Sequence, residues 1–255
     1  MAGHILITGA GGGIGSATAR MAAARGYAVS LMARSSGSKE ASALLGEIAA
    51  KGGEAQVVTA DVTSEGDIVD AFKKAADRFG PLTALMNSAG IAYNAPVSAL
   101  DCESIARVMA VNVVGLMLCC REAVSYMSTE AGGQGGSIVN ISSMAATIGG
   151  RPGASVYAAS KGAVDVFTTG FAREVADQGI RVNSVRPGMI ATKMTANLEQ
   201  DAALKKSVEA SIPMKRIGQP EEIAEIVLWL NSPAASFVTG AHINAGGGGF
   251  HIASS

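Results

Sequence analysis

Short apolar runs alternate along this chain with longer stretches in which apolar residues recur at every third or fourth position. The longer stretches include 14–25, 39–51 and 64–79, and their spacing predicts helices. The short runs show little alternation of polar and apolar side chains, which is typical of strands buried on both faces. Seven such runs are present, at 4–8, 28–33, 55–60, 82–87, 136–141, 180–185 and 241–245.

The regular alternation of strand and helix predicts an α/β fold, with a parallel sheet covered by helices on both faces. Because no repeat, low-complexity tract or proline-rich linker divides the sequence, we expect a single domain over residues 1–255. The glycine cluster at 246–249 is interpreted as a terminal turn. The segment 189–214 interrupts the alternation. Its length and apolar residues predict a substrate lid, with a helical insertion as the alternative.

The composition agrees with one globular domain and argues against two other classes of protein. Apolar residues make up 48% of the 255 residues, which excludes a disordered chain. With a net charge of -1 and 4% aromatic residues, the chain lacks the basic surface and the stacking side chains that nucleic-acid binding needs. We therefore expect no nucleic-acid partner.

The longest apolar run, 108–120, is shorter than the roughly 20 residues that span a bilayer, and it contains Asn112. It is interpreted as a helix buried on both sides, so no membrane association is expected. The N-terminal residues lack the basic region that begins a signal peptide. The cysteines are odd in number and are expected to be free thiols: Cys102, Cys119 and Cys120. These features predict a cytoplasmic protein.

A glycine-rich turn follows the first predicted strand. The sequence TGAGGGIG over 8–15 places glycines in the order G-x-x-x-G-x-G, at Gly9, Gly13 and Gly15. Residues without a Cβ allow close approach of a pyrophosphate, and the free N–H groups at a helix start suit its anionic oxygens. The turn therefore predicts a phosphate site, and a purely structural turn is the alternative.

Tyr157 and Lys161 lie four residues apart in a predicted helix, so their side chains share one face. A nearby ammonium stabilises a phenolate and lowers the pKa of the phenol from about 10 towards neutrality. The pair is therefore a candidate acid/base group. A solvated helical pair is the alternative interpretation.

Two other chemistries have little support in the sequence. None of the three histidines has a cysteine or carboxylate at the spacing of a metal site: His4, His242 and His251. The nucleophile motif G-x-S-x-G is also absent. We expect neither a metal centre nor a hydrolase.

Six motifs taken in order resemble the classical short-chain dehydrogenase/reductase family over about residues 4–247. They are TGAGGGIG near the N-terminus, Asn87-Ser-Ala-Gly90, Asn112 in VNVVG, Ser142-Ser143, Tyr157-Ala-Ala-Ser-Lys161 and Pro187-Gly188. The sequences YAASKGAVDVFT and IRVNSVRPG are similar to those of the bacterial branch of glucose-dehydrogenase-like and 3-oxoacyl-carrier-protein-reductase-like members. The resemblance implies one doubly wound Rossmann domain with the strand order 3-2-1-4-5-6-7.

The resemblance also implies hydride transfer between NADP(H) and a carbonyl or alcohol. Tyr157 would be the acid in reduction and the base in oxidation, while Lys161 would hold the nicotinamide ribose and lower the Tyr157 pKa. Ser143 would hydrogen-bond the substrate oxygen. Since Ser143 lies 14 residues before Tyr157, one more than in most relatives, Ser142 is the alternative. Asn112 would anchor a water that relays protons to Lys161.

The type of cofactor depends on the end of the second strand. Ala33 stands where NAD-dependent relatives carry a carboxylate, and Arg34 follows, which favours NADP. Gly12 stands where NADP-dependent relatives often carry a base, which argues the other way, so NAD is the less favoured alternative. The implied cofactor residues are Gly9, Gly13, Ile14, Gly15, Arg34, Ser35, Asp61, Val62, Asn87, Ala89, Gly90, Tyr157, Lys161, Pro187, Gly188, Ile190 and Thr192.

The substrate is expected to be a small free carbonyl or alcohol. Relatives that act on carrier-bound acyl chains have an arginine in the turn matching 128–137, where this chain has no basic residue, although Arg173 matches a second such arginine. The expected apolar walls are Met144, Met189 and Met194. A carrier-bound 3-oxoacyl thioester is the alternative substrate, and a non-catalytic nucleotide sensor is the alternative function. Relatives form tetramers through helices matching 104–128 and 155–176, so a homotetramer is expected.

Overall fold

The computed structural model describes residues 3–34, 39–196 and 201–249. Its centre is a parallel sheet of seven strands in the order β3-β2-β1-β4-β5-β6-β7, which confirms the predicted topology. Each strand agrees with its predicted run to within two residues at either end. The strands are β1 (Gly3–Thr8), β2 (Tyr27–Ala33), β3 (Ala55–Thr59), β4 (Ala84–Asn87), β5 (Gly136–Ile141), β6 (Ile180–Pro187) and β7 (His242–Ala245).

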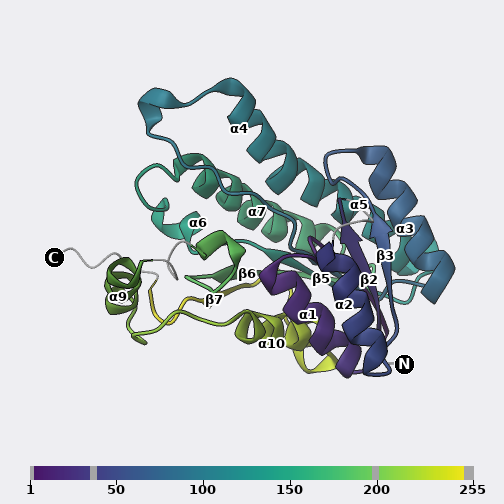
Figure 1. The fold of residues 1–255 in the computed structure, drawn as a ribbon. Coiled ribbons are helices and arrows are strands. Elements are labelled where there is room, and N and C mark those ends of the chain that lie inside the picture. The colour runs from purple at the N-terminus through teal and green to yellow at the C-terminus, as the bar shows by residue number, and fades with distance from the viewer. Residues whose placement is uncertain (1–2, 35–38, 197–200, 250–255) are drawn as a thin grey trace.

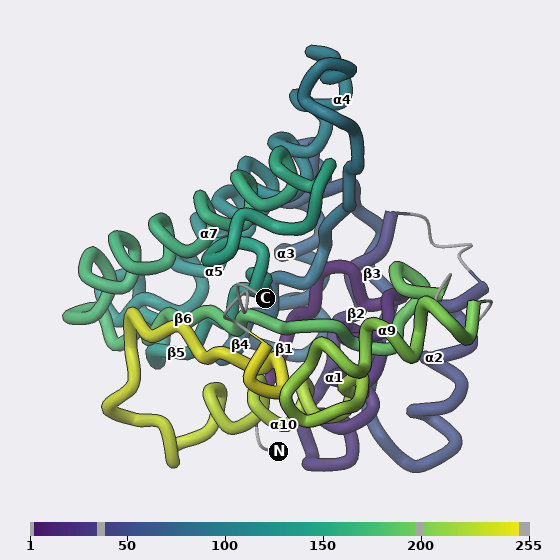
Figure 2. The backbone as a smooth tube through the Cα atoms, turned by 90° about the vertical axis from the view of Figure 1, so that its left-hand side faces the viewer, coloured from purple at the N-terminus to yellow at the C-terminus, as the bar shows by residue number. Residues whose placement is uncertain are grey.

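Helices cover both faces of this sheet, as Figures 1 and 2 show. One core joins the sheet to α1, α2 and α10, and a second core joins its other face to α3, α5 and α7. The helices are α1 (Gly13–Ala24), α2 (Lys39–Ala50), α3 (Glu65–Phe79), α4 (Cys102–Met109), α5 (Gly115–Met127), α6 (Ala145–Ile148), α7 (Ser155–Glu174), α9 (Ala202–Ser211) and α10 (Pro220–Asn231).

The strand register brings distant parts of the sequence to one edge of the sheet. Thr8 pairs with Asn87 across β1 and β4, and Asn87 pairs with Asn140 across β4 and β5. Since all strands are parallel, the loops that follow them leave the sheet at this common edge. In such folds ligands bind outside the carboxyl ends of the strands.

The apolar helix of the sequence is divided in the structure, because a π-helical turn, Ala110–Val114, separates α4 from α5. By length and composition alone, the described stretch Cys102–Met127 could cross a membrane. Cys119 and Cys120 are fully buried in the core, whereas Val114 is 51% exposed. Our expectation of burial on both sides is therefore wrong for the single chain: one face packs on the sheet and the other stays open.

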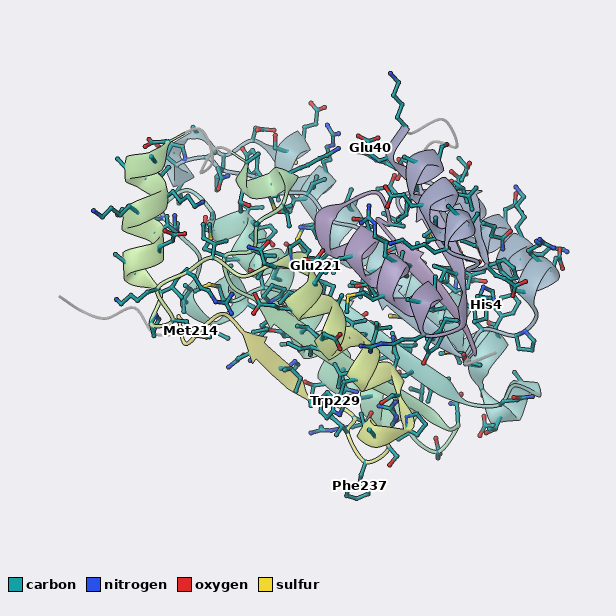
Figure 3. The ribbon with its side chains drawn as sticks, turned by 60° about the horizontal axis from the view of Figure 1, so that its bottom comes forward. His4, Glu40, Met214, Glu221, Trp229 and Phe237 are labelled. Atoms are coloured by element: carbon teal, nitrogen blue, oxygen red, sulfur yellow. The ribbon has the colours of Figure 1, made fainter. Side chains whose placement is uncertain are left out.

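Large apolar side chains are also exposed beside β7. Trp229 on α10 is 41% exposed, and Phe237, in the connection from α10 to β7, points away from the molecule (Figure 3). These two residues and Val114 leave apolar surface that a second chain could cover.

The expected lid segment forms a small layer of its own beyond the sheet. Ile190 makes a parallel bridge to Gly218, and α9 packs through Val208 and Ile212 in a separate apolar cluster. Residues 197–200 lie outside the described residues. The described part thus contains a helical insertion, and its action as a lid stays a prediction.

Candidate active site

The glycine-rich turn has the close contacts that exclude side chains. Gly9 has a φ of +66°, and a Cβ on it would lie 2.8 Å from the backbone of Ala89. A Cβ on Gly15 would lie 2.6 Å from the carbonyl oxygen of Gly9. The N-cap of α1 is Gly12, which offers no side-chain cap, and no acidic residue occupies the first turn. The N-terminal N–H groups of α1 are therefore open to an anion.

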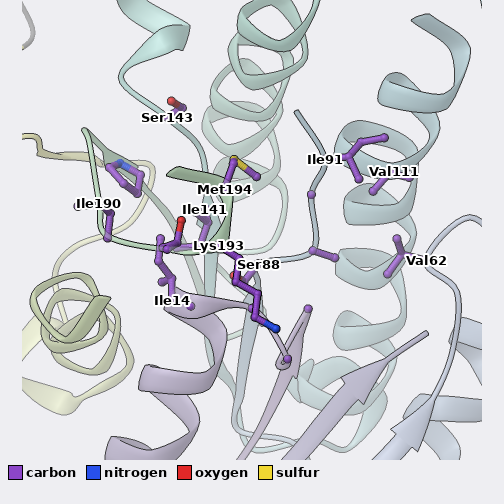
Figure 4. A pocket seen from close by; sticks show the side chains of 18 of the residues that line it. Ile14, Val62, Ser88, Ile91, Val111, Ile141, Ser143, Ile190, Lys193 and Met194 are labelled. Atoms are coloured by element: carbon purple, nitrogen blue, oxygen red, sulfur yellow. The ribbon is translucent and has the colours of Figure 1, made fainter. Parts of the chain in front are cut away.

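A cavity of about 570 Å³ lies at this edge of the sheet and is large enough for a bound cofactor (Figure 4). Figure 4 places Ile14 and Ile190 on one side and Val62 and Val111 on the other. Most of the predicted residues line it: Gly9, Gly13, Ile14, Arg34, Asp61, Val62, Ala89, Gly90, Ser143, Tyr157, Lys161, Pro187, Gly188, Ile190 and Thr192.

Three predicted residues do not line this cavity. Gly15 is buried behind the turn, and Asn112 lies beneath the floor. Asn87 is buried and donates a hydrogen bond from Nδ2 to Asn140 Oδ1 at 3.0 Å, which ties β4 to β5, whereas its Oδ1 has no partner among the described residues. Ser35 lies outside the described residues.

The three methionines predicted as substrate walls lie in different places. Met194 lines the cavity, whereas Met189 lines a second, smaller cavity of about 280 Å³ beside Ile212. Met144 lines neither of these two cavities. The spacing of apolar residues in a loop does not determine which way each side chain points. The sequence therefore could not show which of the three methionines face the larger cavity.

Several lining residues escaped the sequence analysis. Arg107 and Val111 are one helical turn apart and face the cavity together, a spacing that could have been noticed. Lys193 Nζ lies 2.7 Å from Glu40 Oε1 at the cavity, across 153 residues of sequence. No local pattern indicates that pair.

Tyr157 on α7 faces the cavity together with Ser143, which follows β5. Burial raises the pKa of Tyr157 above its ordinary value, and a hydrogen bond with Ser143 opposes that rise. Lys161 Nζ lies 5.9 Å from the centre of the phenol ring. The lowering of the Tyr157 pKa by Lys161 stays a prediction.

Lys161 is buried one turn after Tyr157 and donates a hydrogen bond from Nζ to the carbonyl oxygen of Ile141 at 2.8 Å. Burial lowers the pKa of Lys161 to about 8, and the negative charge of Asp165 opposes this effect. The ammonium therefore loses its proton close to the physiological pH range.

The two serines after β5 have different environments. Ser142 is buried, and its hydroxyl donates to the carbonyl oxygen of Lys161 at 3.2 Å, which ties α7 to the end of β5. Both serines line the cavity, but Ser143 is partly exposed, and its Oγ accepts a hydrogen bond from the N–H of Ala145 at 3.1 Å. This geometry favours Ser143 as the serine that meets a substrate.

Asn112 lies in the π-helical turn and uses its side chain for structure. Its Oδ1 accepts from the N–H of Ile91 at 2.8 Å, and its Nδ2 donates to the carbonyl oxygen of Ile91 and to Ser160 Oγ. Both amide protons are thus engaged within the protein. A water at Asn112 would have to use a different atom, such as its backbone carbonyl.

Two charged residues that line the cavity, Arg34 and Asp61, differ in whether their side chains are already engaged. Arg34 is exposed at the end of β2 and forms no ion pair among the described residues. The carboxylate of Asp61 is engaged within its own loop, because its Oδ1 accepts from both the N–H and the hydroxyl of Thr63. Arg34 is therefore available for an anionic group. Within the described ranges, no three His, Cys, Asp or Glu residues gather as a metal site would require.

Comparisons with known proteins agree with this geometry. Residues 9–251 match the protein family described as enoyl-(acyl carrier protein) reductase. The chain is 46% identical over 245 residues to an uncharacterized oxidoreductase, YgfF, of Escherichia coli (strain K12), covering 95% of this chain and 98% of the relative. It is 38% identical to a 3-oxoacyl-[acyl-carrier-protein] reductase of Synechocystis sp. (strain ATCC 27184 / PCC 6803 / Kazusa), covering 95% of each chain.

Among solved structures, a short-chain type dehydrogenase/reductase from Mycobacterium ulcerans superposes with a TM-score of 0.90. The two sequences are 32% identical, and the match covers 97% of this chain and 89% of the other. The similarity therefore extends over the whole sheet and the loops that carry the site.

Proposed function

Because the chain belongs to the classical short-chain dehydrogenase/reductase family, whose members are oxidoreductases that use NAD or NADP, we propose that it transfers a hydride between NADP(H) and a small carbonyl or alcohol. The observation that carries this proposal is the gathering of Ser143, Tyr157 and Lys161 on one wall of a cavity that begins at a glycine-rich helix start. When bound, the cofactor supplies or accepts the hydride.

The chain's own residues would handle the proton and the developing charge. In carbonyl reduction, Tyr157 gives its phenolic proton to the substrate oxygen, and in alcohol oxidation it takes that proton back. Ser143 donates a hydrogen bond to the same oxygen and stabilises charge that grows there. Lys161, held by the Ile141 carbonyl, places a positive charge behind the phenol. Asn112 supports the floor through Ile91 and Ser160 and would anchor a relay water.

The preference for NADP is proposed from the end of β2. Arg34 lines the cavity without an ion-pair partner among the described residues, and the neighbouring Ala33 brings no carboxylate to repel a 2′-phosphate. The cavity residues fit the remainder of the cofactor, because the bare N-terminus of α1 suits a pyrophosphate. NAD is the less favoured alternative.

A small, free substrate is proposed over a carrier-bound one. No basic residue occupies 128–137, where a carrier protein with acidic helices would be steered, whereas Arg173 alone matches the relatives of that type. The relative from Synechocystis is named for a carrier-bound substrate, so the thioester remains the alternative.

The test is a panel of ketones, sugars and 3-oxoacyl thioesters, with oxidation of NADPH followed by absorbance. We expect turnover of a free carbonyl, and Tyr157→Phe should lower it by about a thousandfold while retaining NADPH binding. Tight NADPH binding without turnover of any compound would instead favour a nucleotide sensor. A carrier-linked thioester preferred more than tenfold over its free counterpart, with the advantage lost in salt, would overturn the small-substrate proposal.

We also propose that the protein forms a homotetramer in the cytoplasm. Val114, on the predicted interface helix, is 51% exposed, and Val166, on α7, is 76% exposed in the single chain. Such apolar side chains favour burial against another copy. Free, buried thiols at Cys119 and Cys120 suit a reducing compartment.

A further inference from the structure

Asp165 is a buried carboxylate that the proposed mechanism does not use. It lies on α7 one turn after Lys161 and is 6% exposed. Its Oδ2 accepts a hydrogen bond from Arg186 Nε at 2.8 Å, and its Oδ1 accepts one from the Ser184 hydroxyl at 3.0 Å. Burying a charge of this kind is costly unless it is paired, so the arrangement is a built feature of the fold.

The network around Asp165 joins three elements. The hydroxyl of Ser184, on β6, lies 2.6 Å from Nδ1 of His242 on β7. The other ring nitrogen, Nε2, lies 3.0 Å from the hydroxyl of Thr169 on α7. Helix α7 is thus tied to both strands at the end of the sheet, on the side of Lys161 that faces away from Tyr157.

The two ends of this network reach the candidate active site. Through α7 it continues to Lys161, whose ammonium lines the cavity. Through β6 it continues to Pro187 and Gly188, which follow Arg186 directly and also line the cavity. A change at Asp165 can therefore act on the acid/base group and on the loop opposite it.

We propose that Asp165, held by Arg186 and Ser184, is a positioning residue that places a negative charge one helical turn from Lys161 and fixes the end of β6 for the reaction. This inference rests on the proposed function, since Lys161 matters to catalysis only if the chain is an oxidoreductase of this type.

The charges around Lys161 make this role specific. On α7 it is flanked by Tyr157 and by Asp165; β5 and the π-helical turn contribute the neutral Ile141 carbonyl and Asn112. Beyond Asp165 lie Arg186 on β6 and His242 on β7. The Nδ1 of His242 lies 3.5 Å from Asp165 Oδ1. Burial lowers the pKa of His242, and the negative charge of Asp165 opposes this effect. Among these described residues, Asp165 is therefore the negative charge that favours the protonated form of Lys161, and Arg186 weakens it.

This arrangement predicts opposite effects from two substitutions. Asp165→Asn keeps the shape but removes the negative charge, so Lys161 should lose its proton at lower pH. Arg186→Gln removes the positive charge that weakens Asp165, so Lys161 should keep its proton to higher pH. A residue with a merely structural role would not produce shifts of opposite sign.

The experiment is a ¹³C NMR titration of the Lys161 ε-carbon in the cofactor-free protein, with the signal assigned by its loss in Lys161→Arg. We expect a midpoint about one pH unit lower in Asp165→Asn and higher in Arg186→Gln. The matched control is Ser184→Ala, which removes a hydrogen bond to the carboxylate but no charge and should leave the midpoint nearly unchanged. Midpoints that are equal in wild type, Asp165→Asn and Arg186→Gln would overturn the proposal.

Kinetics give a second, independent readout. In carbonyl reduction, the pH at which kcat/KM declines should move in the same direction as the NMR midpoint, and Asp165→Glu should restore the wild-type value. If Asp165→Asn fails to fold, as judged by circular dichroism, Arg186→Gln and Ser184→Ala still decide between the two outcomes. Absence of any turnover by the wild type would refute the proposed function. The NMR titration would still test the effect of Asp165 on the protonation of Lys161.

Discussion

At the scale of single residues, the candidate site depends on a lysine that the fold holds in an unfavourable environment. Lys161 is 5% exposed, and among the described residues its ammonium donates a hydrogen bond to a backbone carbonyl rather than to a carboxylate. Burial of an ammonium without a direct ion pair costs stability. Active sites that need a group with a shifted pKa commonly bear such a cost. We therefore expect Lys161 to lower the stability of the fold although the proposed reaction needs it.

Lys161→Met tests this conflict. The pKa of about 8 in the folded chain lies below the ordinary 10.5, so the unfolded chain binds more protons between these values and wild-type stability rises from pH 8 to 10.5. At pH 7 the buried charge lowers the free energy of unfolding of the wild type by about 3 kcal/mol. Loss of the hydrogen bond to Ile141 lowers that of the variant by about 1 kcal/mol. We expect an inactive variant that is more stable at pH 7, with the difference shrinking by pH 10. Urea unfolding measures it, and a variant clearly less stable at pH 7 would contradict the argument.

Arg34→Ala tests the cofactor preference. Loss of a charge-assisted contact to a phosphate costs about 1.5–3 kcal/mol, or roughly tenfold to over a hundredfold in affinity. We expect weaker binding of NADPH and unchanged binding of NADH in a fluorescence titration. The matched control is Lys193→Ala, because that cation also lines the cavity but is already paired with Glu40. Equal wild-type affinities for both cofactors would contradict the proposed preference.

At the scale of elements, the site depends on the meeting of the glycine-rich turn with the start of the segment 189–214. A Cβ on Gly13 would lie 2.7 Å from Thr192 Cγ2, so the two segments touch only because Gly13 has no side chain. Thr192 also begins the short turn Lys193–Thr195, which carries Met194 into the cavity. This contact fixes where the expected lid begins.

Gly13→Ala should therefore push that segment outward. Overpacking of this kind costs about 1–3 kcal/mol, so we expect about fivefold to over a hundredfold weaker cofactor binding by isothermal titration calorimetry. Adding Thr192→Ser removes the clashing methyl and should recover part of the loss. Gly11→Ala is the control, because its Cβ would make an ordinary contact of 3.7 Å with Glu40. An equal loss in both alanine variants would show that the contact with Thr192 is unimportant.

At the scale of the whole molecule, the open apolar face of α7 predicts assembly. Val166 is 76% exposed near the middle of that helix, and its replacement by Asp should leave a lone chain intact but disfavour a buried interface. We expect Val166→Asp to shift the mass in light scattering from tetramer to smaller species. Val69→Asp is the control, since Val69 is exposed on α3, outside the predicted interface helices. A wild-type monomer would refute the tetramer.

The sequence by itself determined the elements and most of the site. Strand runs, helical spacing and the turn at Gly9 follow from local periodicity and from steric rules that act within a few residues. The strand order and the roles of Tyr157 and Lys161 were implied by the resemblance of six motifs to the family. The local features need no knowledge of what packs against them, whereas the strand order rests on that resemblance.

Only the tertiary structure decided how side chains divide their roles. It brought both serines after β5 to the cavity but bound the Ser142 hydroxyl to α7, and it turned Asn87 into the core. It also brought Asp165 to Arg186, and Lys193 to Glu40. Which way a side chain turns and which distant residue it meets depend on strand register and helix packing, and these are properties of the assembled core that no local pattern in the sequence contains.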